Sequence, residues 1–263
     1  MAANSKIEWT DHTSNLWWGC VKVHAGCDNC YAEAWSNRFG NDIWGHGTPR
    51  KIIKHPFRTL MKYQRKAASE GKKVKVFVGS MMDIFEKSQP MIDHNGHSLD
   101  IKTGDLRDQF FMRIDKGEYP NINFLLLTKR PSNINKMIPE KWKRSPPENV
   151  WFGCSPVDQK TYDKLVPQLL QVHGNKFLSI EPQLGLIDIT TVQGFDTIDW
   201  IIQGGESGKN RRPFRFEWAH SLRDQCEIWR IRYFFKQIDK VMEIPQVMLV
   251  REFPSRMNAT IPT

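Results

Sequence analysis

Short runs of consecutive apolar residues alternate along the chain with longer segments in which apolar residues recur at helical spacing. Runs rich in Val, Ile, Leu and Phe predict strands at residues 74–79, 123–128, 150–154, 176–180, 198–203 and 231–235. Because their apolar character is continuous, we expect both faces of these strands to be buried, as in a parallel sheet. A seventh strand is expected near residues 15–19.

Amphipathic segments between these runs predict helices at residues 31–38, 105–116, 160–172 and 216–229. Repeated strand–helix units favour right-handed crossovers and a parallel sheet. We therefore expect an α/β fold: a parallel (β/α) TIM-like barrel, full or partial, of about six to seven strands. A flat, doubly wound sheet fits the same pattern, because the pattern does not decide whether the sheet closes.

The predicted strands and helices lie within residues 1–237, which we expect to form a single barrel domain. A length of 263 residues suits one barrel, which commonly needs about 250. Residues 40–47 and 93–104 are interpreted as excursions from the barrel. Residues 238–263 are expected to form a tail that packs on the barrel or is partly loose.

Net charge, the length of apolar runs and the placement of the cysteines indicate which partners and which compartment to expect. A net charge of +9 favours a polyanionic partner, such as a nucleotide or nucleic-acid substrate. The chain contains no apolar run of about 18 residues, so we expect no membrane span. It opens without the apolar run of a signal peptide, which predicts a cytoplasmic protein. Three of the five cysteines fall within eleven residues, which in a reducing compartment indicates metal binding before disulfide bonding.

These three residues, Cys20, Cys27 and Cys30, have the spacing C-x6-C-x2-C. Thiolates select zinc, copper(I) or iron–sulfur clusters, and three of them leave one iron of a four-iron cluster without a protein ligand. A structural zinc site fits the spacing equally well, with His24 or Cys154 as the fourth ligand. We expect Gly26 to supply unusual backbone angles within the loop. Cys226 lies in a helical pattern and is interpreted as an inert buried thiol.

Polar residues follow the predicted strands, and in a parallel barrel these positions open onto one face, where active sites lie. The candidate catalytic residues are Asp83, Lys129 and Glu181. The candidate cofactor-binding residues are Tyr31, Ser80, Gly204, Gly205 and Glu206. Paired glycines let backbone amides approach a ligand closely, and Glu206 can bind a cation or a sugar hydroxyl. The candidate binders of phosphate or carboxylate are Lys129, Arg130, Arg211, Arg212 and Lys236.

A three-cysteine loop after the first strand of a parallel barrel resembles the radical S-adenosylmethionine superfamily. The resemblance implies a [4Fe-4S] cluster on Cys20, Cys27 and Cys30, with S-adenosylmethionine bound at the open iron. The first cysteine interval is three residues longer than the usual C-x3-C-x2-C pattern. Gly204-Gly205-Glu206 is similar to the Gly-Gly-Glu of those enzymes. It follows the sixth predicted strand here and the second strand there, so its role is not transferred.

The chain also resembles a largely uncharacterised family of bacteriophage and prophage proteins from residue 6 to residue 237. The matching segments are KIEWTD at residues 6–11, CDNCYAE at 27–33, TKRP at 128–131, SIEP at 179–182 and GGESG at 204–208. This resemblance implies a phage or bacterial setting, with the protein in the host cytoplasm and a phage-encoded protein as a candidate partner. It implies no particular reaction.

Three classes of function follow from these observations. The first is a radical S-adenosylmethionine-type enzyme that generates a 5′-deoxyadenosyl radical, acts on a nucleotide or nucleic-acid base, and requires a reducing electron donor. The second is a zinc-stabilised nucleic-acid-binding or partner-binding protein without catalysis. The third is a barrel hydrolase using Asp83, Glu181 and Glu206, which leaves the cysteine loop unexplained.

Overall fold

The main sheet has seven parallel strands in the order β1-β4-β7-β8-β9-β10-β11. The computed structural model describes residues 5–208 and 210–258 of the chain. The strands are His12–Ser14 (β1), Val74–Val78 (β4), Ile122–Thr128 (β7), Val150–Cys154 (β8), Asn175–Ile180 (β9), Trp200–Gly204 (β10) and Arg232–Gln237 (β11). The six strands predicted from continuous apolar runs are confirmed as members of this sheet.

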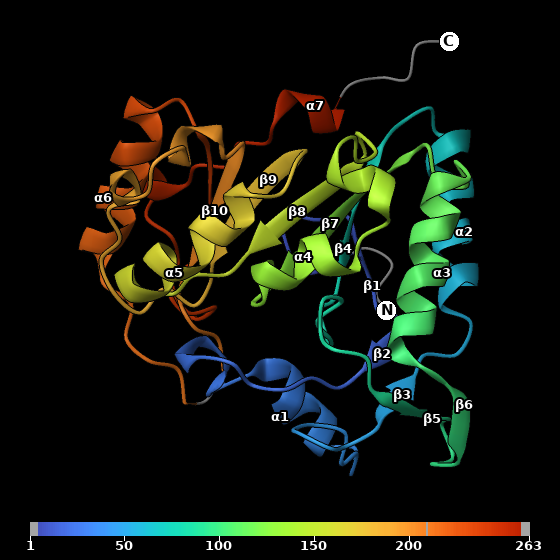
Figure 1. Cartoon of the computed structure of the whole chain (residues 1–263). Coiled ribbons are helices and arrows are strands. Elements are labelled where there is room, and N and C mark those ends of the chain that lie inside the picture. Colours follow the sequence, from blue (N-terminus) through green and yellow to red (C-terminus); the bar gives the residue numbers. More distant parts are fainter. Residues whose placement is uncertain (1–4, 209, 259–263) are drawn as a thin grey trace.

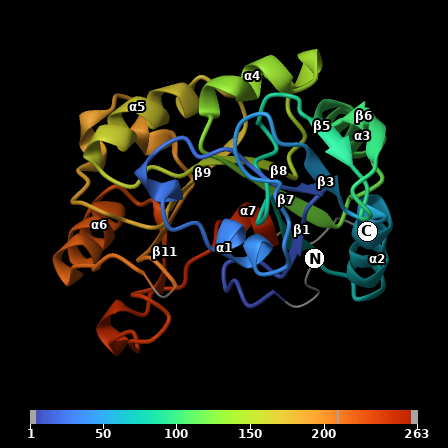
Figure 2. The same cartoon turned by 90° about the horizontal axis from the view of Figure 1, so that it is seen from below.

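The sheet curls into a half-barrel (Figures 1 and 2), and β1 and β11 are its two edges. The predicted parallel α/β fold is therefore confirmed in its partial-barrel form. Along each strand, successive side chains point to opposite faces of the sheet. In β4, for example, Val76 and Val78 belong to one hydrophobic cluster, and Phe77 belongs to another.

Helices cover the convex face of the half-barrel (Figure 1). They are Pro56–Ser69 (α2), Thr103–Asp115 (α3), Ile134–Met137 (α4), Gln159–Leu170 (α5) and Phe216–Ile228 (α6). Their apolar side chains, such as Leu60, Phe110 and Leu165, pack with the strands into the larger hydrophobic cluster. The three predicted helices that include α3, α5 and α6 are confirmed to within two residues at each end. Among the described residues, no helix is long and apolar enough to cross a membrane.

The concave face holds a second, mainly aromatic cluster, and the chain termini help to fill it. Trp9 lies 4.8 Å from Phe77 between ring centroids, and Phe253 lies 5.4 Å from Trp200. Met257, in Ser255–Asn258 (α7), joins the same cluster. Phe253 and Met257 of the predicted tail thus pack against the half-barrel, whereas residues 240–243 and 245–247 are exposed. Residues 259–263 of the predicted tail lie outside the described residues.

A second sheet, in the order β2-β3-β5-β6, projects from the end of the half-barrel where the strands finish. It consists of Trp17–Trp18 (β2), Arg50–Ile52 (β3), Pro90–Ile92 (β5) and Ser98–Lys102 (β6). The predicted excursion at residues 93–104 contains β6. The predicted first strand at residues 15–19 is wrong, because the barrel strand is the earlier, polar segment β1 and part of the predicted run forms β2.

Candidate functional site

A cavity of about 220 Å³ lies at the carboxyl ends of the parallel strands. Its floor includes Trp9 and Phe77 from the concave aromatic cluster, and its wall includes the loop of residues 19–30, here called the cysteine loop. All three predicted ligands, Cys20, Cys27 and Cys30, line the cavity. The other predicted site residues that line it are Tyr31, Ser80, Asp83, Lys129, Arg130, Glu181, Gly205, Glu206 and Lys236. Gly204 is not among the lining residues.

The cysteine loop has its own local structure. A short 3-10 helix, Ala25–Cys27, begins where His24 Nδ1 accepts a hydrogen bond of 3.1 Å from the amide of Gly26. The helix Tyr31–Asn37 (α1) then starts directly after Cys30. Unusual backbone angles were expected at Gly26, but it is not among the glycines with a positive φ. Glycine is needed there for space, since an added Cβ would lie 2.7 Å from Val157 Cγ1.

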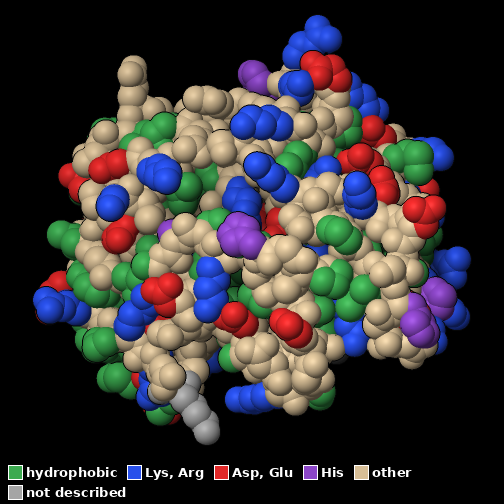
Figure 3. Space-filling view, turned by 60° about the horizontal axis from the view of Figure 1, so that its bottom comes forward, with side chains coloured by type: hydrophobic (Ala, Val, Ile, Leu, Met, Phe, Trp, Pro, Cys, Tyr) green, Lys and Arg blue, Asp and Glu red, His purple; other side chains and the backbone are tan. Residues whose placement is uncertain are grey.

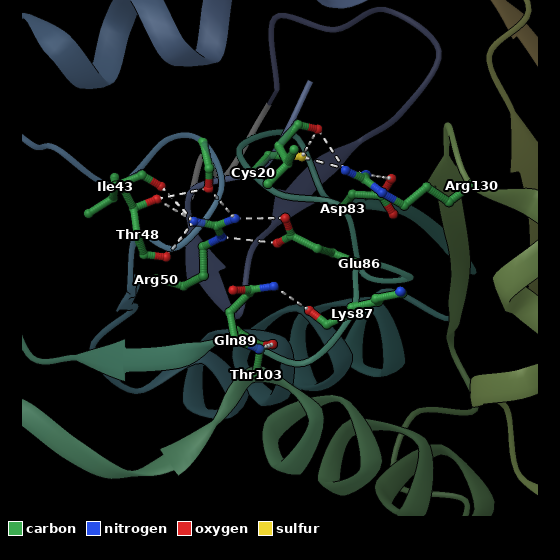
Figure 4. Close-up of polar contacts among 12 residues, drawn as sticks. Cys20, Ile43, Thr48, Arg50, Asp83, Glu86, Lys87, Gln89, Thr103 and Arg130 are labelled. Atoms are coloured by element: carbon green, nitrogen blue, oxygen red, sulfur yellow. Dashed lines mark hydrogen bonds and ion pairs between the residues drawn. The ribbon is translucent and has the colours of Figure 1, made fainter. Parts of the chain in front are cut away.

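One side of the cysteine loop is held by Arg130, which lies between the loop and Asp83 (Figure 4). Arg130 Nη2 donates to the carbonyl oxygen of Val21 at 2.6 Å, and Nη1 lies 3.8 Å from Cys20 Sγ. The same Nη1 donates to Asp83 Oδ2 at 2.7 Å. Asp83 also accepts hydrogen bonds from the Thr128 hydroxyl and from backbone amides at residues 85 and 129. The Asp83 carboxylate is therefore saturated, and its evident role is to fix Arg130.

The other side of the loop is held by Arg212 through Glu206, which is buried just after β10. Arg212 Nη2 donates to the carbonyl oxygen of Ala25 at 3.0 Å. Glu206 binds Arg212 through Nε at 2.9 Å and Nη2 at 2.5 Å, and it accepts from Asn29 Nδ2 at 2.9 Å. Burial alone would raise the pKa of Glu206, but these hydrogen bonds lower it overall, so the carboxylate stays ionised. Glu206, like Asp83, positions the loop.

A third arginine attaches the second sheet to the same region (Figure 4). Arg50 in β3 is fully buried and forms a two-point ion pair with Glu86, at 3.0 Å from Nε and 2.7 Å from Nη2. Its remaining donors bind carbonyl oxygens of residues 43, 45 and 48 and the Thr48 hydroxyl. A buried guanidinium is stable only when its donors are satisfied in this way. The contacts hold residues 43–48 beside the cysteine loop.

Glu181 differs from the other two carboxylates in the cavity. It follows β9 and pairs with Lys236 of β11, across the glycine end of β10. An added Cβ on Gly205 would lie 1.9 Å from the carbonyl oxygen of Ile238, so the chain there has no room for a side chain. The pair is partly buried, and Lys236 is the partner that the structure gives Glu181. A substrate group could replace this lysine without disturbing a larger network.

The predicted anion binders mostly have carboxylate partners of their own. Arg130 and Arg212 hold the cysteine loop, Arg211 Nε pairs with Asp239 at 2.7 Å, and Lys236 pairs with Glu181. Lys129 lines the cavity and forms no ion pair within residues 5–208 and 210–258. The sequence did not single out Asn29 or Lys240, which also line the cavity. Asn29 lies between Cys27 and Cys30, where a side-chain amide could have been considered as a loop anchor.

The three thiols line one cavity, but in this structure they are not arranged as a metal site. Cys20 is largely buried, and its pKa is raised to about 12, first by burial and then by the charge of Asp83, with Arg130 opposing the rise. Such a thiol is protonated in the metal-free protein, and metal binding must displace its proton. Within the described residues, no group of three or more His, Cys, Asp or Glu side chains is arranged to hold a metal ion.

Neither predicted fourth zinc ligand lines the cavity. Cys154 belongs to the hydrophobic cluster on the convex, helix-covered side of the sheet. His24 uses Nδ1 to accept the Gly26 amide, and it is not a lining residue. Cys226, interpreted from the sequence as a buried thiol, is a buried residue of α6 in the hydrophobic core.

Comparison with known proteins identifies the family but no activity. A family described as "Protein of unknown function (DUF5131)" matches residues 4–253. The chain belongs to this family. No curated protein matches the chain, and no solved structure matches it.

Proposed function

We propose that this protein is an iron–sulfur enzyme of the radical S-adenosylmethionine type. Cys20, Cys27 and Cys30 would hold a [4Fe-4S] cluster, and S-adenosylmethionine would bind in the cavity beside it. The observation that carries the proposal is that three thiols from one loop line a single cavity at the carboxyl ends of a parallel half-barrel. Neither alternative zinc ligand, His24 or Cys154, is among the residues that line that cavity.

The chemistry supplied when both groups are bound is the one-electron reductive cleavage of S-adenosylmethionine to methionine and a 5′-deoxyadenosyl radical, which abstracts hydrogen from the substrate. The electron comes from a reducing donor protein or small molecule. The chain's own residues would position the cysteine loop and keep water from the reacting groups. Arg130 and Arg212 fix the cysteine loop, and Trp9 and Phe77 give the cavity an apolar floor that excludes water.

The substrate we propose is a nucleotide or a nucleic-acid base. Lys129 and Lys240 can bind phosphate at the cavity wall, because both line it and neither is ion-paired within the described part of the chain. The Glu181–Lys236 pair offers one acceptor and one donor for polar groups of a base. The proposal places the protein in the cytoplasm, that of a host cell if the chain is phage-encoded.

Anaerobic purification followed by metal analysis tests the proposal. The wild type should be brown, with about four irons and four sulfides per chain, and Cys27→Ala should lose them. Cys226→Ala is the matched control, because it removes a buried cysteine far from the cavity and should keep the iron. Colourless protein with one zinc per chain, lost in Cys27→Ala, would remove the radical mechanism and favour a zinc-stabilised binding protein.

A further inference from the structure

Three exposed aromatic side chains form a line that starts at the cavity. Tyr31, Trp35 and Phe39 are four residues apart, a spacing that places side chains on one face of a helix. Tyr31 and Trp35 belong to α1. Phe39 lies two residues beyond its end, with its ring centroid 4.7 Å from that of Trp35. Their exposed fractions are 51%, 40% and 62%. We call these three residues the aromatic stripe.

Contacts with the rest of the protein hold two residues of the aromatic stripe, Tyr31 and Trp35, in place. Tyr31 lines the cavity, and its hydroxyl donates to the carbonyl oxygen of Ser80 at 2.8 Å. Trp35 is supported by Trp18 of β2, whose ring meets it edge-on at 4.9 Å. The rings are therefore held in place while much of their surface remains in contact with solvent. Exposed aromatic side chains that are held in place beside a cavity favour a binding site.

Cations without carboxylate partners lie along the same path. Arg38, which is exposed, directly precedes Phe39, and Lys129 and Lys240 line the cavity. Considering only residues 5–208 and 210–258, none of the three forms an ion pair. Figure 3 brings this end of the molecule forward and shows Lys and Arg side chains spread over the face. Together with the net charge of +9, this favours an anionic ligand that also carries flat, apolar groups.

We propose that the aromatic stripe and the cavity together bind single-stranded nucleic acid. The target nucleotide enters the cavity, and the neighbouring bases pack against Trp35 and Phe39. Base–aromatic packing and phosphate–cation contacts are the two elements of sequence-tolerant single-strand binding. A duplex fits poorly, because its bases are already stacked on one another. The inference names the substrate class of the cavity and rests on the proposed function for the reaction, but the binding step is measured independently of it.

Fluorescence anisotropy with a fluorescein-labelled single strand of about 12 nucleotides tests the inference. We expect the double variant Trp35→Ala/Phe39→Ala to bind at least about tenfold more weakly than the wild type. Trp229→Ala is the matched control, since Trp229 is 46% exposed at the end of α6, and it should bind as the wild type does. The conservative variant Trp35→Tyr/Phe39→Tyr keeps an aromatic ring at both positions and should bind more tightly than the double alanine variant, which separates stacking from misfolding.

Salt dependence tests the contribution of phosphate contacts. Binding should weaken between about 50 and 200 mM salt, and Arg38→Gln should reduce the slope of log K against log salt by about one. The inference is overturned if the single strand does not bind, if the double variant binds as tightly as the wild type, or if an unlabelled duplex competes equally well.

Running the assay on metal-free and on anaerobically purified protein separates the two proposals. Stripe-dependent binding by anaerobically purified protein that contains no iron would support the nucleic-acid surface and remove the radical mechanism. An iron-loaded protein that does not bind the single strand keeps the radical mechanism and overturns this inference.

Discussion

Replacing Asp83 by asparagine tests whether this carboxylate positions the cysteine loop or acts in chemistry. The Asp83 side chain is 7% exposed and that of Arg130 is 14% exposed. Asparagine keeps the shape of aspartate but removes its charge, and its NH₂ group would face donors that now bind a carboxylate oxygen. Arg130 would then remain in a buried site without a counter-charge.

The expected loss in free energy of unfolding follows from the burial of the pair and from the hydrogen bond that Arg130 keeps. Removing one partner of a buried ion pair costs about 3–5 kcal/mol. Arg130 would keep its 2.6 Å hydrogen bond to the Val21 carbonyl oxygen. We therefore expect Asp83→Asn to lower the free energy of unfolding of the metal-free protein by about 3 kcal/mol, the lower end of that range. Glu140→Gln is the control, because its ion pair with Lys143 is exposed and should contribute less than about 1 kcal/mol.

Urea unfolding of four proteins completes the test: wild type, Asp83→Asn, Arg130→Met and the double variant. If the two side chains act as a pair, Asp83→Asn should cost at least about 1 kcal/mol less in the Arg130→Met background than alone. A cost below about 0.5 kcal/mol for Asp83→Asn, with additive effects, would refute the positioning role. Asp83 would then return as a candidate catalytic group.

Three further predictions follow from neighbouring contacts. Burial and the charge of Lys129 lower the pKa of His24 from 6.5 to about 4, so the unfolded chain takes up this proton first as the pH falls. The free energy of unfolding of the metal-free wild type should therefore fall by up to about 3 kcal/mol between pH 6.5 and 4. His24→Asn keeps an acceptor for the loop amide, and its free energy of unfolding, measured by urea titration at each pH, should fall by less. Gly205→Ala should lower the free energy of unfolding by about 3 kcal/mol or more, because its Cβ would lie 1.9 Å from the carbonyl oxygen of Ile238. In the control Gly185→Ala the nearest atom is Asp158 Cβ at 3.5 Å, so the free energy of unfolding should change by less than about 1 kcal/mol. Glu206→Gln should speed amide hydrogen exchange in residues 24–29 at least about tenfold, since a charge-assisted hydrogen bond contributes about 1.5–3 kcal/mol, and unchanged exchange would contradict the positioning role.

The main sheet could be predicted because its strands are buried on both faces. Residues 150–154 are all buried, and β8 has the predicted bounds. The first strand was misplaced because β1 is short and consists of His12, Thr13 and Ser14, whose polar side chains give no apolar pattern although they are buried. The second sheet was missed for a similar reason. β6 alternates between exposed and half-buried residues, and β2 has only two residues.

The position of the candidate site could be predicted, but the partners of its residues could not. The sequence places Asp83 and Glu206 after strands, and both lie at the cavity. Their function depends on contacts that join distant parts of the chain. Arg130 reaches Val21 across 109 positions, and Arg212 reaches Ala25 across 187. No local pattern indicates such pairings, so two positioning residues were assigned as candidates for catalysis or cofactor binding.

These assignments bear directly on the hydrolase alternative, which required Asp83, Glu181 and Glu206 to act together. A carboxylate that already accepts several hydrogen bonds, including bonds from an arginine, is a poor base because its charge is stabilised and its lone pairs are occupied. That condition holds for Asp83 and Glu206 but not for Glu181, whose partner is Lys236. One available carboxylate in the cavity does not provide the paired acid and base of such a hydrolase. Glu181 remains available as a polar contact for a substrate that enters the cavity.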